Sequence, residues 1–199
     1  MIISITGHRP NGLPREYGYN LNNEAWTKLK EYIEATIEEC YKYATQNEEL
    51  TLVTGMALGV DTVFWEVAAK LRKNNKNIKI EAAVPFVGQE KKWTHESQKQ
   101  YKQMLSESDK VTIVSEGGFT TWKMMARNRY MVNKSDIVIA IICKETGGTA
   151  QCVKYAKEHN KVVIVCDYDF NQEKALLLMD NMLERNIDGL IFQGVHLTD

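Results

Sequence analysis

Short runs of β-branched and aliphatic residues alternate along the chain with longer stretches in which apolar residues recur every three or four positions. The short runs predict strands at 2–6, 50–54, 78–84, 110–114, 137–142 and 162–166. The longer stretches predict helices near 21–47, 61–74, 95–107, 121–134 and 149–160. Strands separated by helices of this length form βαβ units, so the pattern predicts an α/β fold with a mostly parallel sheet.

Two of the predicted strands are apolar along their whole length. Their sequences, IVIAII at 137–142 and VVIV at 162–165, do not alternate with polar residues. Strands of this kind are covered on both faces, as central parallel strands are.

The chain has the length of one domain with a core of its own, at 199 residues. It contains no Pro/Ser-rich linker, low-complexity tract or internal repeat. We therefore expect a single domain over 1–199, with its core at 1–166. The segment 167–199 is expected to extend that domain with a helix near 171–185 and a short strand at 190–193.

Composition argues against several classes of protein. The net charge of −1 provides no overall field that would draw the protein to DNA or to a membrane. No apolar run reaches the length of a membrane span, and MIISITGHRP lacks the basic start of a secretory signal, so a cytoplasmic location is expected.

The four cysteines, Cys40, Cys143, Cys152 and Cys166, show neither a CxxC spacing nor paired histidines. We therefore expect no metal site, no disulfide framework and no cofactor. Cys152 lies one turn into a helix after two glycines, where a thiolate would be stabilised; the alternative is a buried, unreactive thiol.

The segments that follow the predicted strands differ from those that precede them. They read GHRP at 7–10, TGMALGVD at 54–61, PFVGQEKKW at 85–93, SEGGFTTW at 115–122 and KETGGT at 144–149. The opposite edge, with NNKN and KEHNK, has the composition of solvated turns. Because ligands bind beyond the carboxyl ends of parallel strands, the sequence predicts a binding site at the first edge.

The stretch Gly147-Gly148-Thr149 opens a predicted helix. Free backbone amides at such a place suit an anion, often a phosphate, although a tight turn with a threonine cap has the same sequence. A capping box would place Glu or Gln three residues after Thr149, where Cys152 stands. Because the sequence assigns no side chain to accept hydrogen bonds from the free amides of this helix, it favours a bound ligand over a simple capped turn.

The turn after the second strand offers a similar choice. Gly55 and Gly59 flank Met56 and Ala57, and either they allow close packing of strand and helix or they open a cradle of amides for phosphate. Asp61 would then cap the helix or hold a ribose hydroxyl. The stretch is neither GxGxxG nor a P-loop.

Arg9 follows a strand between a histidine and a proline, and its guanidinium suits a phosphate or a carboxylate; the alternative is a surface arginine. His8 could be a base, a stacking partner or a packed imidazole. Pro85, Phe86 and Trp93 could wall a pocket for a base, or pack beneath their loop.

The helix TWKMMARNRYMV carries two further candidates, Arg127 and Asn128. If Arg127 faces the cleft, it supplies a second cation there. The alternative is a solvated basic face of the helix.

Five stretches occur in an order that resembles the YpsA-like branch of the SLOG superfamily: ITGHRP, TGMALGVDTVFWEVA, PFVGQEKKW, RNRYMVNKSDIVIAI and GGTAQCVKYA. That superfamily includes the DNA-processing protein DprA and the LOG enzymes, which release cytokinin bases from their ribotides. The resemblance covers about residues 1–166. It implies a Rossmann-like three-layer sandwich, a nucleotide-derived ligand and a homodimer or higher homo-oligomer. It places the ligand around Gly7, Arg9, Gly55, Asp61, Arg127, Gly147, Gly148 and Thr149.

One position departs from the LOG pattern PGGxGTxxE. In GGTAQC, Cys152 stands where the catalytic glutamate would be, and the preceding proline and extra glycine are absent. A cysteine does not replace a carboxylate that activates water or stabilises an oxocarbenium-like transition state. Asp61 and Glu66 are the carboxylates that could substitute.

Three hypotheses follow. The chain is a binding protein that senses or sequesters a nucleotide-derived small molecule, of the ADP-ribose type, in conflict between phage and bacterium. Alternatively, it is an N-glycosidase of nucleotides. The third hypothesis is single-stranded DNA binding as in DprA, which the near-neutral net charge disfavours.

Overall fold

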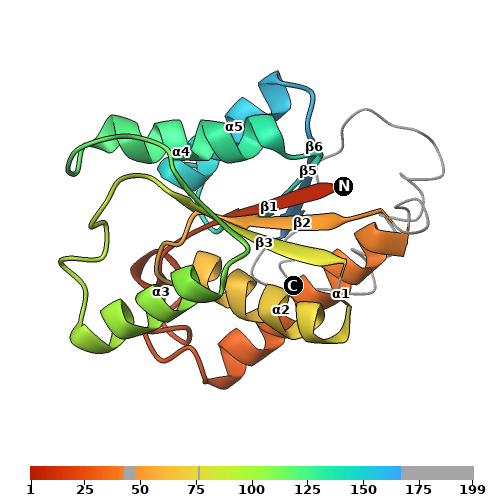
Figure 1. Ribbon diagram of the computed structural model, residues 1–199, viewed down its shortest axis with the longest axis horizontal. Coiled ribbons are helices and arrows are strands. Elements are labelled where there is room, and N and C mark those ends of the chain that lie inside the picture. Colours follow the sequence, from red (N-terminus) through yellow and green to blue (C-terminus); the bar gives the residue numbers. More distant parts are fainter. Residues whose placement is uncertain (43–47, 76, 167–199) are drawn as a thin grey trace, which may run out of the picture.

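The computed structural model describes residues 1–42, 48–75 and 77–166, and within them six strands form one parallel sheet (Figure 1). The order across the sheet is β4-β3-β2-β1-β5-β6. The strands are β1 Ile2–Gly7, β2 Leu50–Thr54, β3 Ile78–Val84, β4 Lys110–Ile113, β5 Ile137–Ile141 and β6 Val162–Cys166. All neighbouring strands are parallel, so the predicted α/β fold is confirmed. The elements expected in 167–199 lie outside the described residues.

Helices cover both faces of the sheet, α4 and α5 one face and α1 and α2 the other (Figure 1). They are α1 Glu24–Lys42, α2 Val60–Asn74, α3 His95–Glu107, α4 Thr121–Lys134 and α5 Gly148–Glu158, with a 3-10 turn at Pro10–Gly12. The first helix begins at Glu24 rather than at 21, because the Asn23 side chain accepts a hydrogen bond from the Trp26 amide at 3.0 Å. No helix in the described ranges is long and apolar enough to cross a membrane.

The apolar core lies on both faces of the sheet. Strand β5 illustrates this: Ile139 packs in the large cluster with α1 and α2, while Val138 and Ala140 pack in the smaller cluster with α4 and α5. Because successive side chains of a strand point to opposite faces, a run covered on both faces must be apolar throughout.

The direction in which successive strands are added to the sheet reverses at β1. From β1 it proceeds outward through β2 and β3 to β4, and then returns to place β5 on the free side of β1. The connection after β1 leads to α1 on one face, and the connection after β5 leads to α5 on the other (Figure 1). These connections diverge, so a crevice is expected beyond the carboxyl ends of β1 and β5.

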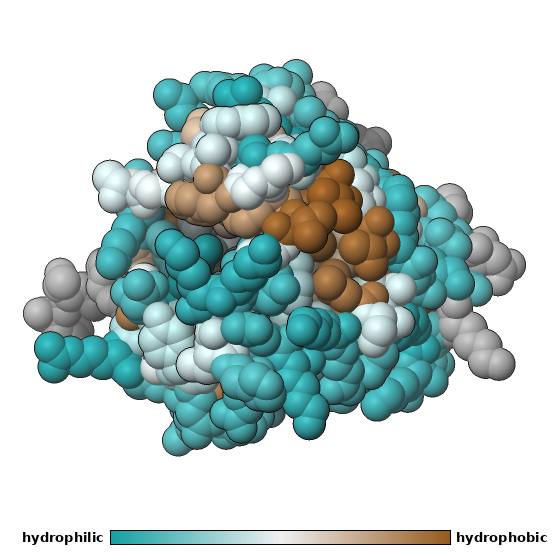
Figure 2. Space-filling view, turned by 60° about the vertical axis from the view of Figure 1, so that its left-hand side comes forward, coloured by the Kyte–Doolittle hydropathy of each residue, from teal (hydrophilic) through white to brown (hydrophobic). Residues whose placement is uncertain are grey.

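The side of the molecule that carries the segments after β3 and β4 comes forward in Figure 2. Its surface is largely hydrophilic, with one continuous hydrophobic area. The large apolar side chains exposed in the described residues include Val87, Val111, Ile113, Phe119 and Trp122.

A buried carboxylate, Glu81 of β3, is enclosed by hydrogen-bond donors. It accepts from the Tyr130 hydroxyl at 2.6 Å and from the Thr112 hydroxyl at 2.9 Å, and it pairs with Lys134 and, at 3.6 Å, with Lys110. Burial alone would raise the pKa of Glu81, but these hydrogen bonds and the charge of Lys134 outweigh it and lower the pKa.

Glu81 therefore makes stability depend on pH. A carboxyl whose pKa is lowered on folding stabilises the fold fully above its ordinary value of 4.5, and this contribution is lost as the pH falls below that value. We expect Glu81→Gln to flatten the fall in unfolding free energy between about pH 6 and about pH 3. Urea denaturation at each pH measures this, with the exposed Glu31→Gln as control. Equal pH profiles of Glu81→Gln and wild type would contradict it.

Candidate functional site

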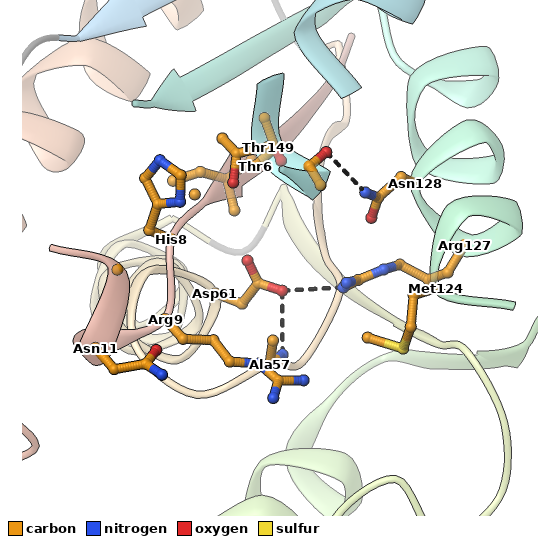
Figure 3. A pocket seen from close by; sticks show the side chains of 14 residues that line it. Thr6, His8, Arg9, Asn11, Ala57, Asp61, Met124, Arg127, Asn128 and Thr149 are labelled. Carbon is orange, nitrogen blue, oxygen red and sulfur yellow. Dashed lines mark hydrogen bonds and ion pairs between the residues drawn. The ribbon is translucent and has the colours of Figure 1, made fainter. Parts of the chain in front are cut away.

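A cavity of about 280 Å³ opens at the carboxyl edge of the sheet, where β1 and β5 end (Figure 3). The predicted site residues that line it are Gly7, His8, Arg9, Ala57, Asp61, Arg127, Asn128, Gly148 and Thr149. Ile5, Thr6, Asn11, Gly12 and Met124, which the sequence analysis did not single out, complete the lining. The cavity therefore lies at the edge that the loop sequences indicate.

Asp61 and Arg127 form a buried ion pair inside this cavity. The Arg127 Nη1 donates to Asp61 Oδ2 at 3.0 Å, and the two side chains are 8% and 6% exposed. The Ala57 amide donates to the same Oδ2 at 3.0 Å (Figure 3). Arg127 thus faces the cleft, and its alternative interpretation as part of a solvated helix face is wrong.

Because Gly55 has no side chain, the Arg127 guanidinium can occupy the space beside it. A Cβ on Gly55 would lie 1.1 Å from Arg127 Nη1 and 2.8 Å from Asp61 Oδ2. Gly59 has another reason to be glycine: its φ is +92°, and a Cβ there would lie 2.8 Å from the Pro10 ring. Both glycines lie beside the cavity without lining it, and Gly55 serves the packing of a guanidinium.

The turn between Gly55 and Asp61 is fixed by short-range hydrogen bonds. The Thr54 hydroxyl donates to the Asp61 carbonyl at 2.9 Å, and the Thr62 hydroxyl donates to the Ala57 carbonyl at 2.9 Å. Met56 has a φ of +59°, and its carbonyl accepts a hydrogen bond from the Gln89 side chain at 2.9 Å. Met56 is buried, which accounts for its absence from the lining.

The N-terminus of α5 meets the cavity without a capping side chain. Gly147 is the N-cap, with a φ of +95° that favours glycine, and within the described residues no side-chain cap accepts a hydrogen bond from the first turn. In the same ranges, nothing lies within 4 Å of a Cβ placed on Gly147 or Gly148. The predicted absence of a capping side chain is confirmed, but its cause differs: the cap position is Gly147 and not Thr149, so Cys152 does not stand where a capping box would need Glu or Gln. The positive end of the helix dipole faces the cavity.

Two buried nitrogen atoms of the lining have no hydrogen-bond partner within the described residues: Arg127 Nε and His8 Nε2. The Arg9 guanidinium is exposed and likewise pairs with no group in the ranges the structure covers. Burial, followed by the charge of Lys144, lowers the pKa of His8, so its ring is neutral at pH 7. The lining then carries two guanidinium groups and one carboxylate, and its net charge is positive.

Cys152 packs behind this wall. It is 4% exposed, and burial raises the pKa of its thiol despite a hydrogen bond with Thr6 and the nearby charge of Arg127. Of the two alternatives for Cys152, the stabilised thiolate is therefore wrong, because desolvation at this depth outweighs the hydrogen bond with Thr6 and the charge of Arg127.

The aromatic residues proposed to wall a base pocket lie outside the lining. Phe86 is 5% exposed and packs edge-on against Phe119, with ring centroids 6.0 Å apart. Trp93 packs edge-on against Tyr101 at 5.4 Å, and Pro85 is buried. The apolar side chain that α4 contributes is Met124, which the helical spacing from Arg127 and Asn128 could have revealed.

Within the described residues, no group of three or more His, Cys, Asp or Glu side chains could hold a metal ion.

Comparison with known proteins gives a family match over most of the chain. The YpsA model, described as the YspA SLOG family, matches residues 3–193. The SPbeta prophage-derived protein YoqJ of Bacillus subtilis (strain 168) is 32% identical over 149 residues, which cover 69% of this chain and 85% of YoqJ. The UPF0398 protein YpsA of the same strain is 23% identical over 149 residues, 74% of this chain and 79% of that protein.

Among solved structures, DNA processing protein A from Helicobacter pylori aligns with a TM-score of 0.55 at 18% identity, covering 94% of this chain and 80% of that one. DprA from Streptococcus pneumoniae aligns with a TM-score of 0.52 at 14% identity, covering 94% of this chain. The match spans only 57% of the pneumococcal protein. At these identities the likeness shows a shared fold.

The packing of Arg127 against Gly55 gives a stability prediction. We expect Gly55→Ala to lower the unfolding free energy by about 1–3 kcal/mol, because the new methyl group displaces a buried guanidinium. The matched control is Gly118→Ala, where the methyl group meets open space and about 0.5 kcal/mol or less is expected. Urea denaturation measures both. Equal stability of the two variants would show that Arg127 does not need this space.

Proposed function

The chain belongs to the YspA SLOG family, and from this membership and the geometry of its cavity we propose that it binds a nucleotide-derived small molecule through a phosphate group. The observation that carries the proposal is the incomplete pairing of the lining. Three groups without partners in the described residues meet in one cavity with a net positive charge: the N-terminus of α5, the exposed Arg9 guanidinium and the buried Arg127 Nε. Buried donors without partners are rare in proteins, so Arg127 Nε is expected to gain its partner from a ligand, which the other two groups would also bind.

The phosphate would bind the amides at the start of α5 together with Arg9. Anions bind at helix N-termini because the amides there point outward and the dipole favours negative charge. The Arg9 guanidinium can donate two parallel hydrogen bonds to phosphate oxygens. Arg127, oriented by Asp61, would add a donor from the opposite wall of the cavity (Figure 3).

Asp61 is suited to a ribose hydroxyl. Both hydrogen bonds that its carboxylate accepts within the described residues, from Arg127 and from Ala57, go to Oδ2. Its Oδ1 therefore retains the capacity to accept a hydrogen bond from a sugar. The same cavity would hold a phosphate and the ribose attached to it.

A sensor or a sequestering protein fits this site better than an enzyme of the LOG type. Cys152 occupies the position of the LOG glutamate and carries a neutral thiol. The name of the relative YoqJ, a prophage-derived protein, agrees with a role between phage and bacterium. We therefore propose a signalling nucleotide of the ADP-ribose type as ligand, bound by a homo-oligomer in the cytoplasm.

Hydrolysis of a nucleotide remains the second candidate, because one carboxylate, Asp61, lines the cavity. Glu66 is not available for it: its carboxylate pairs with Lys30 at 2.9 Å and accepts a hydrogen bond from Gln100 at 2.9 Å, outside the lining. If the chain releases a free base from an added nucleotide, Asp61→Asn should abolish that release. Chromatography of the products measures it, and intact nucleotide would reject this candidate.

Calorimetric titration with AMP, ADP-ribose and ribose 5-phosphate tests the binding proposal. We expect saturable binding that Arg9→Gln weakens about tenfold or more, because a charge-assisted hydrogen bond is lost. Arg15→Gln is the matched control, since Arg15 is exposed in the same connection and does not line the cavity. Absence of saturable binding to all three compounds, or equal losses in both variants, would overturn the proposal. Binding of single-stranded DNA at low salt instead would favour the DprA-like alternative.

A further inference from the structure

The cavity is small compared with common ligand pockets. Its volume of about 280 Å³ lies just below the range of about 300–1,000 Å³ that such pockets span. A ribose phosphate that occupies it would leave an attached base against the neighbouring surface. The surface next to the cavity would therefore contact the base and influence which nucleotide binds.

One wall of the cavity is suited to an apolar group. The connection after β1 contributes His8, Arg9 and Asn11, and α5 contributes backbone amides. Met124, near the start of α4, is a partly exposed apolar side chain of the lining, whereas Ile5 is buried. A base that avoids the polar walls would leave the cavity past Met124.

An exposed aromatic ring lies at the same edge of the sheet, in the loop that leads into α4. Phe119 is 68% exposed, and one side of its ring packs edge-on against the buried Phe86. These two residues follow the carboxyl ends of the neighbouring strands β3 and β4. Figure 2 shows a continuous hydrophobic area on the side of the molecule where these segments lie. An exposed phenyl ring with a fixed backing is a suitable surface for a planar base.

The loop that presents Phe119 is held by a buried cation. Lys123 is 8% exposed, and its ammonium donates to the Glu116 carbonyl and, at 2.7 Å, to the Gly118 carbonyl. Gly117 between them has a φ of +71°. A buried ammonium without its hydrogen bonds is costly, so the loop is restrained in this arrangement before any ligand binds. A surface fixed in advance loses little conformational freedom on binding.

We propose that Phe119 is the stacking surface for the aromatic base of the ligand, with Lys123 as the positioning residue of its loop. The inference rests on the proposed binding of a phosphate and ribose in the cavity. It names the ligand class as a nucleotide that carries a base, in distinction from a base-free sugar phosphate.

Trp122 provides a matched control for Phe119. It is 60% exposed and stands three residues further along the chain. By helical spacing, Met124, Arg127 and Asn128 share one face of α4, while Trp122 lies on the opposite face with Met125 and Arg129. The centre of its ring lies 5.8 Å from the Lys123 ammonium, and we expect that ammonium to keep its hydrogen bonds to the Glu116 and Gly118 carbonyls when the ring is removed. The variant therefore deletes an exposed aromatic ring outside the proposed path of the base.

The experiment is calorimetric titration of wild type, Phe119→Ala and Trp122→Ala with AMP and with ribose 5-phosphate. We expect Phe119→Ala to weaken AMP binding about tenfold, since loss of base–aromatic stacking reduces affinity by about 5- to 150-fold. Its affinity for ribose 5-phosphate should change by less than about twofold, and Trp122→Ala should bind both compounds like wild type.

The outcomes separate the two proposals. If wild type binds ribose 5-phosphate as tightly as AMP, or if Phe119→Ala keeps full AMP affinity, the stacking surface is refuted while the phosphate site stands. If Trp122→Ala loses AMP affinity and Phe119→Ala does not, the base lies on the other face of α4 and the inference is wrong. If neither compound binds to wild type, the proposed function fails and the inference fails with it.

Discussion

The ion pair between Asp61 and Arg127 holds together the parts of the chain that make the cavity. It joins the first turn of α2 to the middle of α4, two helices on opposite faces of the sheet. Removing two charges from water is expensive, and their mutual attraction compensates only when the geometry is good and further hydrogen bonds are made. The Ala57 amide supplies one of these bonds, and the absence of a side chain on Gly55 gives the guanidinium its space. The turn from Thr54 to Thr62 is thus arranged around a single carboxylate.

Glu81 and Arg127, two buried charged groups near α4, differ in how completely they are paired. Glu81 accepts hydrogen bonds from two hydroxyl groups and pairs with the Lys134 ammonium. Arg127 is also buried, yet its Nε has no partner among the described residues and it borders a cavity. His8 Nε2, in the same lining, likewise has no partner within those ranges. Unpaired buried polar atoms lower stability and are rare, which is the reason to propose that a ligand completes their pairing.

The fold that this chain shares with other open parallel sheets explains where the cavity lies, but it does not explain the function of the cavity. The order of the strands brings the ends of β1 and β5 together and sends their connections to opposite faces. That position is common to open parallel sheets with many different ligands. The likeness to two DprA proteins accordingly describes the scaffold. The features that bear on its use are local: a neutral, buried Cys152, an Arg9 that has no partner within the described residues, and an exposed Phe119.

The sequence by itself determined the elements, the parallel sheet and the edge at which the cavity lies. Periodicity is a local property, so IVIAI predicts a strand covered on both faces, and the two glycines before Thr149 predict a helix start without a capping side chain. Tertiary structure decided which candidates meet. Phe86 is buried and Trp93 is half-buried, each against another ring, because tertiary packing, which no local pattern encodes, places them there. Met124 reaches the cavity because α4 presents one face there, and Gly55 is glycine because a guanidinium distant in sequence occupies the place of its side chain. Distances between residues far apart in the chain exist only once the chain is folded.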